Sequence, residues 1–97
     1  MAKGYWVVHL DVTDVAAYQS YREFVQPFLD ANNGRFVVRG GMQEVTEGNV
    51  RPRTVIVEFP SFDIAKRAYH SAEYSEGKAL RTPISDADFA IVEGNDA

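Results

Sequence analysis

Four short runs typical of β-strands are separated by helical segments, and their order constrains the fold more than any other feature of the chain. The runs lie at residues 5–12, 35–39, 54–59 and 89–93 and are rich in β-branched and aromatic residues. A β-α-β-β-α-β order with right-handed crossovers predicts an antiparallel sheet in strand order 4-1-3-2, with the helices on one face. The 97 residues are therefore expected to form one ferredoxin-like α+β domain with a polar tail at 94–97.

Apolar residues at helical spacing follow the first strand and define the first helix. Thr13 or Asp14 can cap its start, because a side-chain oxygen there can accept a free backbone N–H. Asn32-Asn33-Gly34 is expected to end it. Pro27 lies inside the helix and removes one backbone donor, so we expect it to kink or split the helix.

A second helical region follows the third strand. Ser61 is predicted to cap its start, and Ser71 to cap a further helical piece that runs to Leu80. The side of the first piece that faces the core is expected to consist of Ile64, Ala65, Ala68 and Tyr69.

Glycines mark the points where the chain is expected to turn. We predict a positive φ for Gly34 and for one of Gly40 and Gly41, because a Cβ is penalised at a helix end and at the end of a strand. Residues 42–52 contain the turn signal Glu47-Gly48-Asn49 and are expected to form a hairpin arm that leads into the third strand.

The sheet face away from the helices is too apolar to stay in water. By strand alternation it includes Tyr5, Val7, Val37, Ile56, Ala90 and Val92. A large exposed apolar patch usually marks an interaction site, so a second copy of the chain is expected to cover it. The predicted homodimer should bury on the order of 2,000 Å² or more.

Composition excludes several classes of function. The net charge of −4 provides no overall field for nucleic acid or anionic lipid, and neither is expected as a partner. The chain has no cysteine, and His9 and His70 lack the spacing of metal ligands, so no metal or other cofactor is expected. No apolar run is long enough for a signal peptide or a membrane helix, which makes the cytoplasm the expected location.

Ionisable residues on the strands are the first candidates for a site. By strand alternation His9, Arg39, Glu58 and Asp88 are expected to share the helix-free face. In one interpretation His9 is a general base and Arg39 holds an acidic group of a ligand. In the other, His9 is a partly buried structural histidine, and Arg39 forms ion pairs with Asp88 or Glu58 that close the dimer.

Four tyrosines of the helical segments form a second group of candidates: Tyr18, Tyr21, Tyr69 and Tyr74. They can line an apolar pocket between the helices and the sheet, or belong to the core with their hydroxyls at its rim. His70 and Arg81 are expected to be charges at the surface or at helix ends.

The stretches KGYWVVHLDVTD, GRFVVRGG, VIVEFPSF, AYHSAEYSEGKALR and ADFAIVEG together resemble the domain of unknown function 1330 family. The resemblance extends from Lys3 to Gly94. It implies a ferredoxin-like subunit of a dimeric α/β barrel, in a superfamily that includes cofactor-free antibiotic-biosynthesis monooxygenases and haem-degrading enzymes. The family itself implies no established reaction. Where it usually has Ser-Pro-Glu-Tyr-Gln, this chain has Ala72 and Ser75 in place of the proline and the glutamine, which leaves the predicted fold unchanged.

Two classes of function remain open at this point. The first is a dimeric module that binds a small, partly apolar or acidic molecule in a cavity. The second is a cofactor-free enzyme, similar to a monooxygenase or an isomerase, with His9 as base and Arg39 as anion holder. An open cavity that contains His9 would favour the enzyme, whereas full occupation of His9 and Arg39 by protein partners would favour a structural role.

Overall fold

The computed structural model describes residues 2–96, and its elements follow the predicted order. They are β1 (Gly4–Val12), α1 (Val15–Ala31), β2 (Arg35–Arg39), β3 (Arg53–Phe59), α2 (Phe62–His70), α3 (Ala72–Arg81), the 3₁₀ turn η1 (Thr82–Ile84) and β4 (Ser85–Glu93). β4 begins four residues earlier than predicted, at Ser85 rather than Phe89. The added residues pair with the end of β1, from His9 to Val12.

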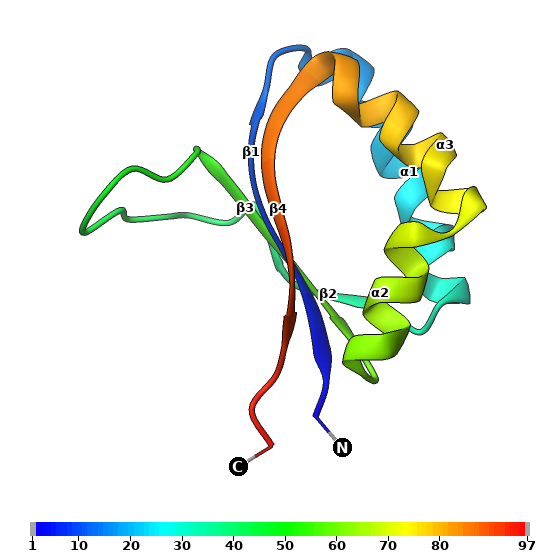
Figure 1. Cartoon of the computed structure of the whole chain (residues 1–97). Coiled ribbons are helices and arrows are strands. Elements are labelled where there is room, and N and C mark those ends of the chain that lie inside the picture. The colour runs from blue at the N-terminus through cyan, green and yellow to red at the C-terminus, as the bar shows by residue number, and fades with distance from the viewer. Residues whose placement is uncertain (1, 97) are drawn as a thin grey trace.

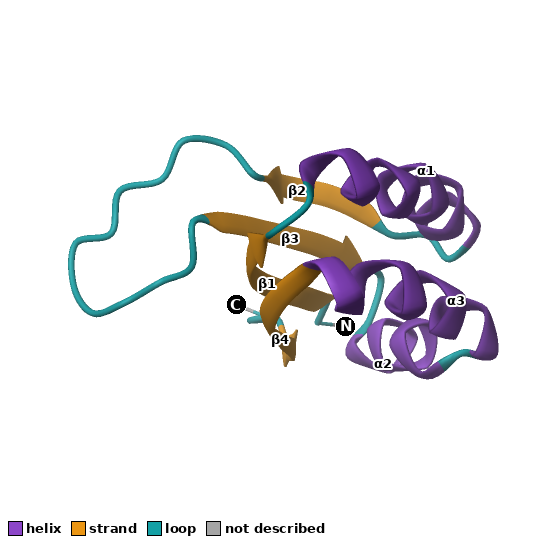
Figure 2. Ribbon diagram, turned by 90° about the horizontal axis from the view of Figure 1, so that it is seen from above, coloured by secondary structure: helices purple, strands orange, loops and turns teal. Residues whose placement is uncertain are grey.

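The sheet has the order β2-β3-β1-β4 with antiparallel neighbours, which is the predicted ferredoxin-like order. All three helices cover one face, and the other face carries none (Figures 1 and 2). The molecule is consequently thin, with principal extents of 38 × 35 × 17 Å.

The core lies between the sheet and the helices and is centred on Trp6. Its indole ring contacts the rings of Phe28, Phe59 and Tyr74, and its N–H donates to the carbonyl of Ala65 at 2.9 Å. A buried indole needs such a partner for its N–H. This hydrogen bond therefore helps to fix α2 against β1.

The helix caps agree with the sequence, but the proline does not split α1. Asp14, Ser61 and Ser71 each accept a backbone N–H at the start of α1, α2 and α3. Of the two outcomes predicted at Pro27, a kink or a split, the split does not occur, since α1 is continuous across it. Burial of Val25 and of other residues on both sides of Pro27 stabilises the helix against the loss of one backbone hydrogen bond.

One of the two predictions for glycine φ angles is confirmed. Gly40 has φ +68°, but Gly34 does not have a positive φ, and Asn33 adopts the left-handed conformation at the end of α1 with φ 61°. Gly34 is required for a different reason. A Cβ at this position would lie 2.8 Å from the Phe59 ring, so the residue allows close packing of the chain on β3.

Residues 40–52 project from the sheet away from the helices as a long loop without strand pairing (Figures 1 and 2). We call this segment the arm. The predicted turn lies within it, and Gly48 has φ +74°. Met42, Val45 and Val50 are among the exposed apolar side chains of the molecule. No helix of the described chain is both long enough and apolar enough to cross a membrane.

Candidate functional site

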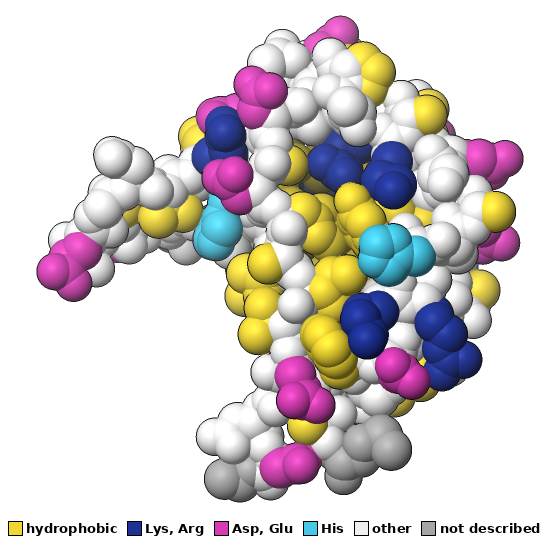
Figure 3. All heavy atoms as spheres, in the orientation of Figure 1, with side chains coloured by type: hydrophobic (Ala, Val, Ile, Leu, Met, Phe, Trp, Pro, Cys, Tyr) yellow, Lys and Arg dark blue, Asp and Glu magenta, His cyan; other side chains and the backbone are white. Residues whose placement is uncertain are grey.

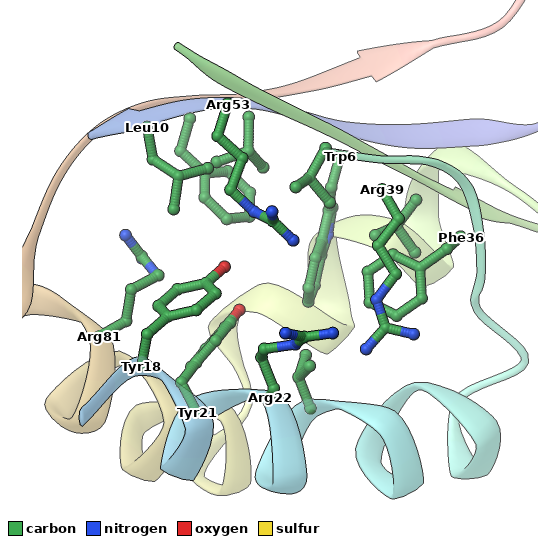
Figure 4. Close-up of a pocket in the computed structure, with 14 residues that line it drawn as sticks. Trp6, Leu10, Tyr18, Tyr21, Arg22, Phe36, Arg39, Arg53 and Arg81 are labelled. Atoms are coloured by element: carbon green, nitrogen blue, oxygen red, sulfur yellow. The ribbon is translucent and has the colours of Figure 1, made fainter. Parts of the chain in front are cut away.

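A narrow cavity of about 30 Å³ lies between the sheet and the helices. Its walls are mainly apolar and include the rings of Trp6, Tyr18, Tyr21, Phe36 and Phe89. Four arginines also line it: Arg22 from α1, Arg39 from β2, Arg53 from β3 and Arg81 from α3 (Figure 4). The space-filling view shows apolar side chains gathered in a hollow between the sheet and the helices, with basic groups beside them (Figure 3).

These four arginines lack acidic partners. Within residues 2–96 the ion pairs are formed by Lys3, Arg35, Arg51 and Lys66, and none is formed by an arginine of the cavity. Four guanidinium groups that remain charged thus converge on an apolar space without a carboxylate to balance them. Arg22 and Arg39 are exposed, whereas Arg53 is half-buried and Arg81 is buried. Burying a charge without a partner is unfavourable, so Arg53 and Arg81 in particular favour occupation by an anion.

Arg81 is the most buried of the four, with 7% of its surface exposed. Arg81 lies at the end of α3, as predicted, but the prediction that it is a surface charge is wrong, because its side chain lies between Tyr21 of α1 and Phe89 of β4. The guanidinium lies 5.5 Å from the Phe89 ring and 5.9 Å from the Tyr21 ring. Its Nε is buried and has no hydrogen-bond partner within the described chain.

Arg53 enters the cavity from the first position of β3. Its Nε is also buried without a partner among residues 2–96, and its guanidinium lies over the Tyr18 ring at 5.6 Å. A Cβ on Gly40 would clash with this guanidinium. The absence of a side chain at Gly40 therefore leaves the space that Arg53 occupies.

Arg39 lies on the opposite face from the one predicted. A β-bulge between Phe36 and Val38 shifts the register of β2, so that Arg39 pairs with Val55, whose side chain faces the helices. The guanidinium lies 4.2 Å from the Phe36 ring and donates to Gln26 Oε1 of α1 at 3.1 Å. It thus lines the cavity and shares no face with His9.

The remaining members of the predicted group do lie on the helix-free face. Glu58 accepts from Arg35 Nε at 3.0 Å, and this bond lowers the pKa of its carboxyl group. Asp88 accepts from Arg51 Nε at 3.1 Å. The predicted ion pairs of Arg39 with Asp88 or Glu58 are therefore wrong within one chain.

His9 belongs to a polar network at the base of the arm rather than to the cavity. Its Nδ1 lies 2.9 Å from Thr54 Oγ1, and the Thr54 hydroxyl donates to Gln43 Oε1. Since the threonine proton is used in this way, His9 Nδ1 is assigned as the donor. Gln43 in turn donates to the carbonyl of Arg51 at 3.0 Å, so the network holds both ends of the arm against the sheet.

The four predicted tyrosines divide between cavity and core. Tyr18 and Tyr21 line the cavity, whereas Tyr74 is fully buried and Tyr69 packs against the core beside it. The hydroxyls of Tyr21 and Tyr74 are 2.7 Å apart. Burial raises the pKa of both phenols, so at neutral pH both keep their protons and one donates to the other.

Three cavity arginines were absent from the predicted site: Arg22, Arg53 and Arg81. Arg53 precedes Val55 by two residues on the same strand, and alternation places both on the helix side. Arg22 follows Tyr18 by one helical turn, so the spacing could have placed it near the cavity. In the described chain no three His, Cys, Asp or Glu side chains gather where they could hold a metal ion.

The fold and the cavity define a ferredoxin-like α+β domain with an arginine-lined space between its sheet and its helices. The sequence matches the family described as "Domain of unknown function (DUF1330)" over residues 3–95, and the chain belongs to that family. This confirms the resemblance found in the sequence. No curated protein matches the chain.

Solved structures agree with the fold. A protein of unknown function from Rhodopseudomonas palustris has a TM-score of 0.76 at 14% identity, over 99% of this chain and 85% of that one. SnoaB, a cofactor-independent oxygenase from Streptomyces nogalater, has a TM-score of 0.71 at 15% identity, over 100% and 97%. A conserved protein from Methanosarcina mazei has a TM-score of 0.56 at 12% identity, over 95% and 93%. At these identities the likeness concerns the fold alone.

Proposed function

We propose that the cavity between the sheet and the helices binds a small, partly apolar, acidic molecule. The observation that carries this proposal is the set of four arginines without acidic partners around an apolar space. Small-molecule sites are typically lined by apolar side chains, with a few polar groups that fix the orientation of the ligand. Guanidinium groups bind carboxylates through paired, charge-assisted hydrogen bonds, and these determine which molecules are accepted.

The alternative, an enzyme that combines His9 as base with Arg39 as anion holder, has less support. Within one chain the two side chains lie on opposite faces of the sheet. A substrate held by Arg39 in the cavity would be separated from His9 by the sheet itself. SnoaB has the same fold and is described as a cofactor-independent oxygenase, but its low identity carries no residue-level argument.

We also propose that the protein is a homodimer whose helix-free sheet faces meet. Val37, Val38 and Val92 are exposed beside the partly exposed Val7 and Ile56. The Cα radius of gyration is 13.4 Å, against about 12.5 Å expected for a compact domain of this length. Pairing would stabilise a thin molecule with one bare apolar face, because it removes that face from water.

Titration calorimetry with 2-naphthoate and its neutral amide tests the cavity. We expect the acid to bind at least about tenfold more tightly than the amide, since the amide has no charge for the arginines. Arg39→Met should lower the affinity for the acid and leave the affinity for the amide unchanged. Arg67→Met is the matched control, because Arg67 is an exposed arginine of α2 outside the cavity. Equal binding of acid and amide, or equal effects of the two substitutions, would contradict the proposal.

A further inference from the structure

We infer that the arm, residues 40–52, is a dimerisation element that packs against the flank of a second copy of this chain. This inference rests on the proposed homodimer and names a further segment of its interface. It is carried by the exposed apolar side chains of the arm, by the contacts that fix its direction, and by its reach compared with the distance between packed sheets.

The arm presents apolar side chains to solvent. Every residue from 41 to 50 is exposed in the single chain. Met42 is fully accessible, and Val45 and Val50 are 43% and 41% exposed. Long loops without secondary structure are uncommon in compact domains, and those that are ordered usually serve a function. Apolar side chains on such a loop favour contact with another protein surface.

Polar contacts at its base fix the direction of the arm. Arg51 donates to Asp11 of β1 at 2.9 Å and to Asp88 of β4 at 3.1 Å. Gln43 donates to the carbonyl of Arg51 at 3.0 Å and thereby joins the two sides of the arm close to the sheet. An arm held in this way loses little conformational freedom when a partner binds, so its apolar contacts contribute more fully to affinity.

The arm stands on the side of the sheet where the second copy is proposed to lie. Figures 1 and 2 both show it projecting from the sheet away from the helices. An apolar row crosses all four strands of this helix-free face and consists of Val38, Ile56, Val7 and Ala90. A copy seated on this row would lie next to the arm. In a dimer with two-fold symmetry, each arm would then flank the other copy.

The reach of the arm exceeds the distance between packed sheets. With about six residues in each direction, its tip can lie up to roughly 20 Å from the sheet. Two packed sheets lie only about 10 Å apart, so the arm is long enough to pass the edge of the partner's sheet.

The helix-free face is also small for a stable dimer. Its strands are 5 to 9 residues long, which gives a plan area of roughly 500 Å² for the four of them. Obligate dimers bury about 1,000 Å² or more of each partner. Contact along the arm would therefore supply part of the area that the sheet face lacks.

Sedimentation velocity of the whole chain tests the arm through the double variant Met42→Glu/Val45→Glu. The dissociation constant of the dimer should rise at least about tenfold, because both carboxylates would have to be desolvated against the second copy. Val15→Glu/Leu80→Glu is the matched control, since it makes the same change at two exposed apolar positions of α1 and α3. The control should leave the dissociation constant unchanged.

Thiol labelling measures the same contact without weakening it by charge. The chain has no cysteine, so Val45→Cys introduces a single thiol on the arm. Its reaction with a maleimide should slow several-fold as the protein concentration rises through the dissociation constant, because the partner then covers the thiol. Val15→Cys, on α1, should react at the same rate at all concentrations.

The outcomes separate this inference from the proposed homodimer. If wild type is dimeric, an unchanged dissociation constant for Met42→Glu/Val45→Glu, or a labelling rate of Val45→Cys that does not depend on concentration, shows that the arm is not part of the interface. The homodimer proposal then stands and the inference is wrong. A wild type that is monomeric at micromolar concentration overturns both. Circular dichroism verifies that each variant is folded, which is expected because the arm residues are exposed.

Discussion

The hydroxyl groups of Tyr21 and Tyr74 lie 2.7 Å apart in the interior, although the residues are 53 positions apart in the sequence. Tyr21 belongs to α1 and Tyr74 to α3, so this bond joins two helices that share one face of the sheet. Tyr21 also lines the cavity, whereas Tyr74 contacts the indole of Trp6. The pair therefore connects the cavity wall to the centre of the core.

Removing one hydroxyl of this pair should lower the free energy of unfolding more than removing both. Tyr21→Phe or Tyr74→Phe leaves the other hydroxyl buried without its partner, which should cost about 1–3 kcal/mol of unfolding free energy. The double substitution removes both polar groups and should cost less than either single substitution. Urea denaturation of the four proteins measures this. Additive losses would show that the hydroxyls do not interact.

Stability should fall at alkaline pH because of the same pair. Burial raises both tyrosine pKa values above the ordinary value of 10.0. The folded protein therefore retains phenolic protons that the unfolded chain loses. The stabilising contribution is fully present below about pH 10 and is lost as pH rises toward the folded-state values. Thermal melts from pH 8 to pH 11.5 should show a steeper decline for the wild type than for the double phenylalanine variant. Equal slopes would contradict this.

Gly40→Ala should destabilise the protein and disturb Arg53. The alanine would have to adopt φ +68° and would place its Cβ against the Arg53 guanidinium. We expect a loss of about 1–3 kcal/mol, together with weaker binding of 2-naphthoate. Gly41→Ala is the matched control, because a Cβ there meets nothing within 4 Å and its φ is not positive, and it should stay within about 0.5 kcal/mol of wild type. A larger loss for Gly41→Ala would refute the assignment.

Sequence reasoning predicted the fold well because the relevant signals are local. Caps such as Ser61 and Ser71 act on the residues that follow them, and strand composition extends over whole segments. These signals were sufficient for the element order and the strand order. Loss of the Pro27 backbone donor did not split α1, because tertiary packing of that helix outweighs one missing hydrogen bond.

The site was predicted less well, because it depends on one irregularity. Alternation along residues 35–39 placed Arg39 beside His9, but a bulge after Phe36 moves it to the helix side. No local pattern in the sequence marks that bulge. Arg81 shows a second limit: a helix-end arginine is usually exposed, and this one is buried by contacts with Tyr21 and Phe89, which are distant in the sequence. The apolar part of the cavity was predicted through Tyr18 and Tyr21, but three of its four arginines were not.

Glu58 should stabilise the folded protein at pH values above its ordinary pKa and should lose this contribution in acid. The bond from Arg35 lowers the pKa of Glu58 from 4.5, so the folded protein holds the ionised form at a pH where the unfolded chain is already protonated. The contribution is present above pH 4.5 and is lost as pH falls through the folded-state value. Glu58→Gln should therefore melt below wild type at pH 7 and like wild type at pH 3. Arg35→Met should give the same pattern, and a pH-independent difference would contradict it.

Val7→Lys should weaken the proposed homodimer without affecting the cavity. Val7 lies at the centre of the helix-free face, paired with Ile56 on one side and Ala90 on the other. In a symmetric dimer both copies would bring a lysine to this face, and the desolvation and repulsion of the two charges should raise the dissociation constant at least about 100-fold. Val15→Lys is the control, because Val15 is an exposed valine at the start of α1, 78% accessible. Sedimentation velocity at micromolar concentration compares the three proteins, and calorimetry with 2-naphthoate verifies that the cavity is intact. A wild type that is monomeric, or a Val7→Lys variant that associates as tightly as Val15→Lys, would show that this face is not the interface.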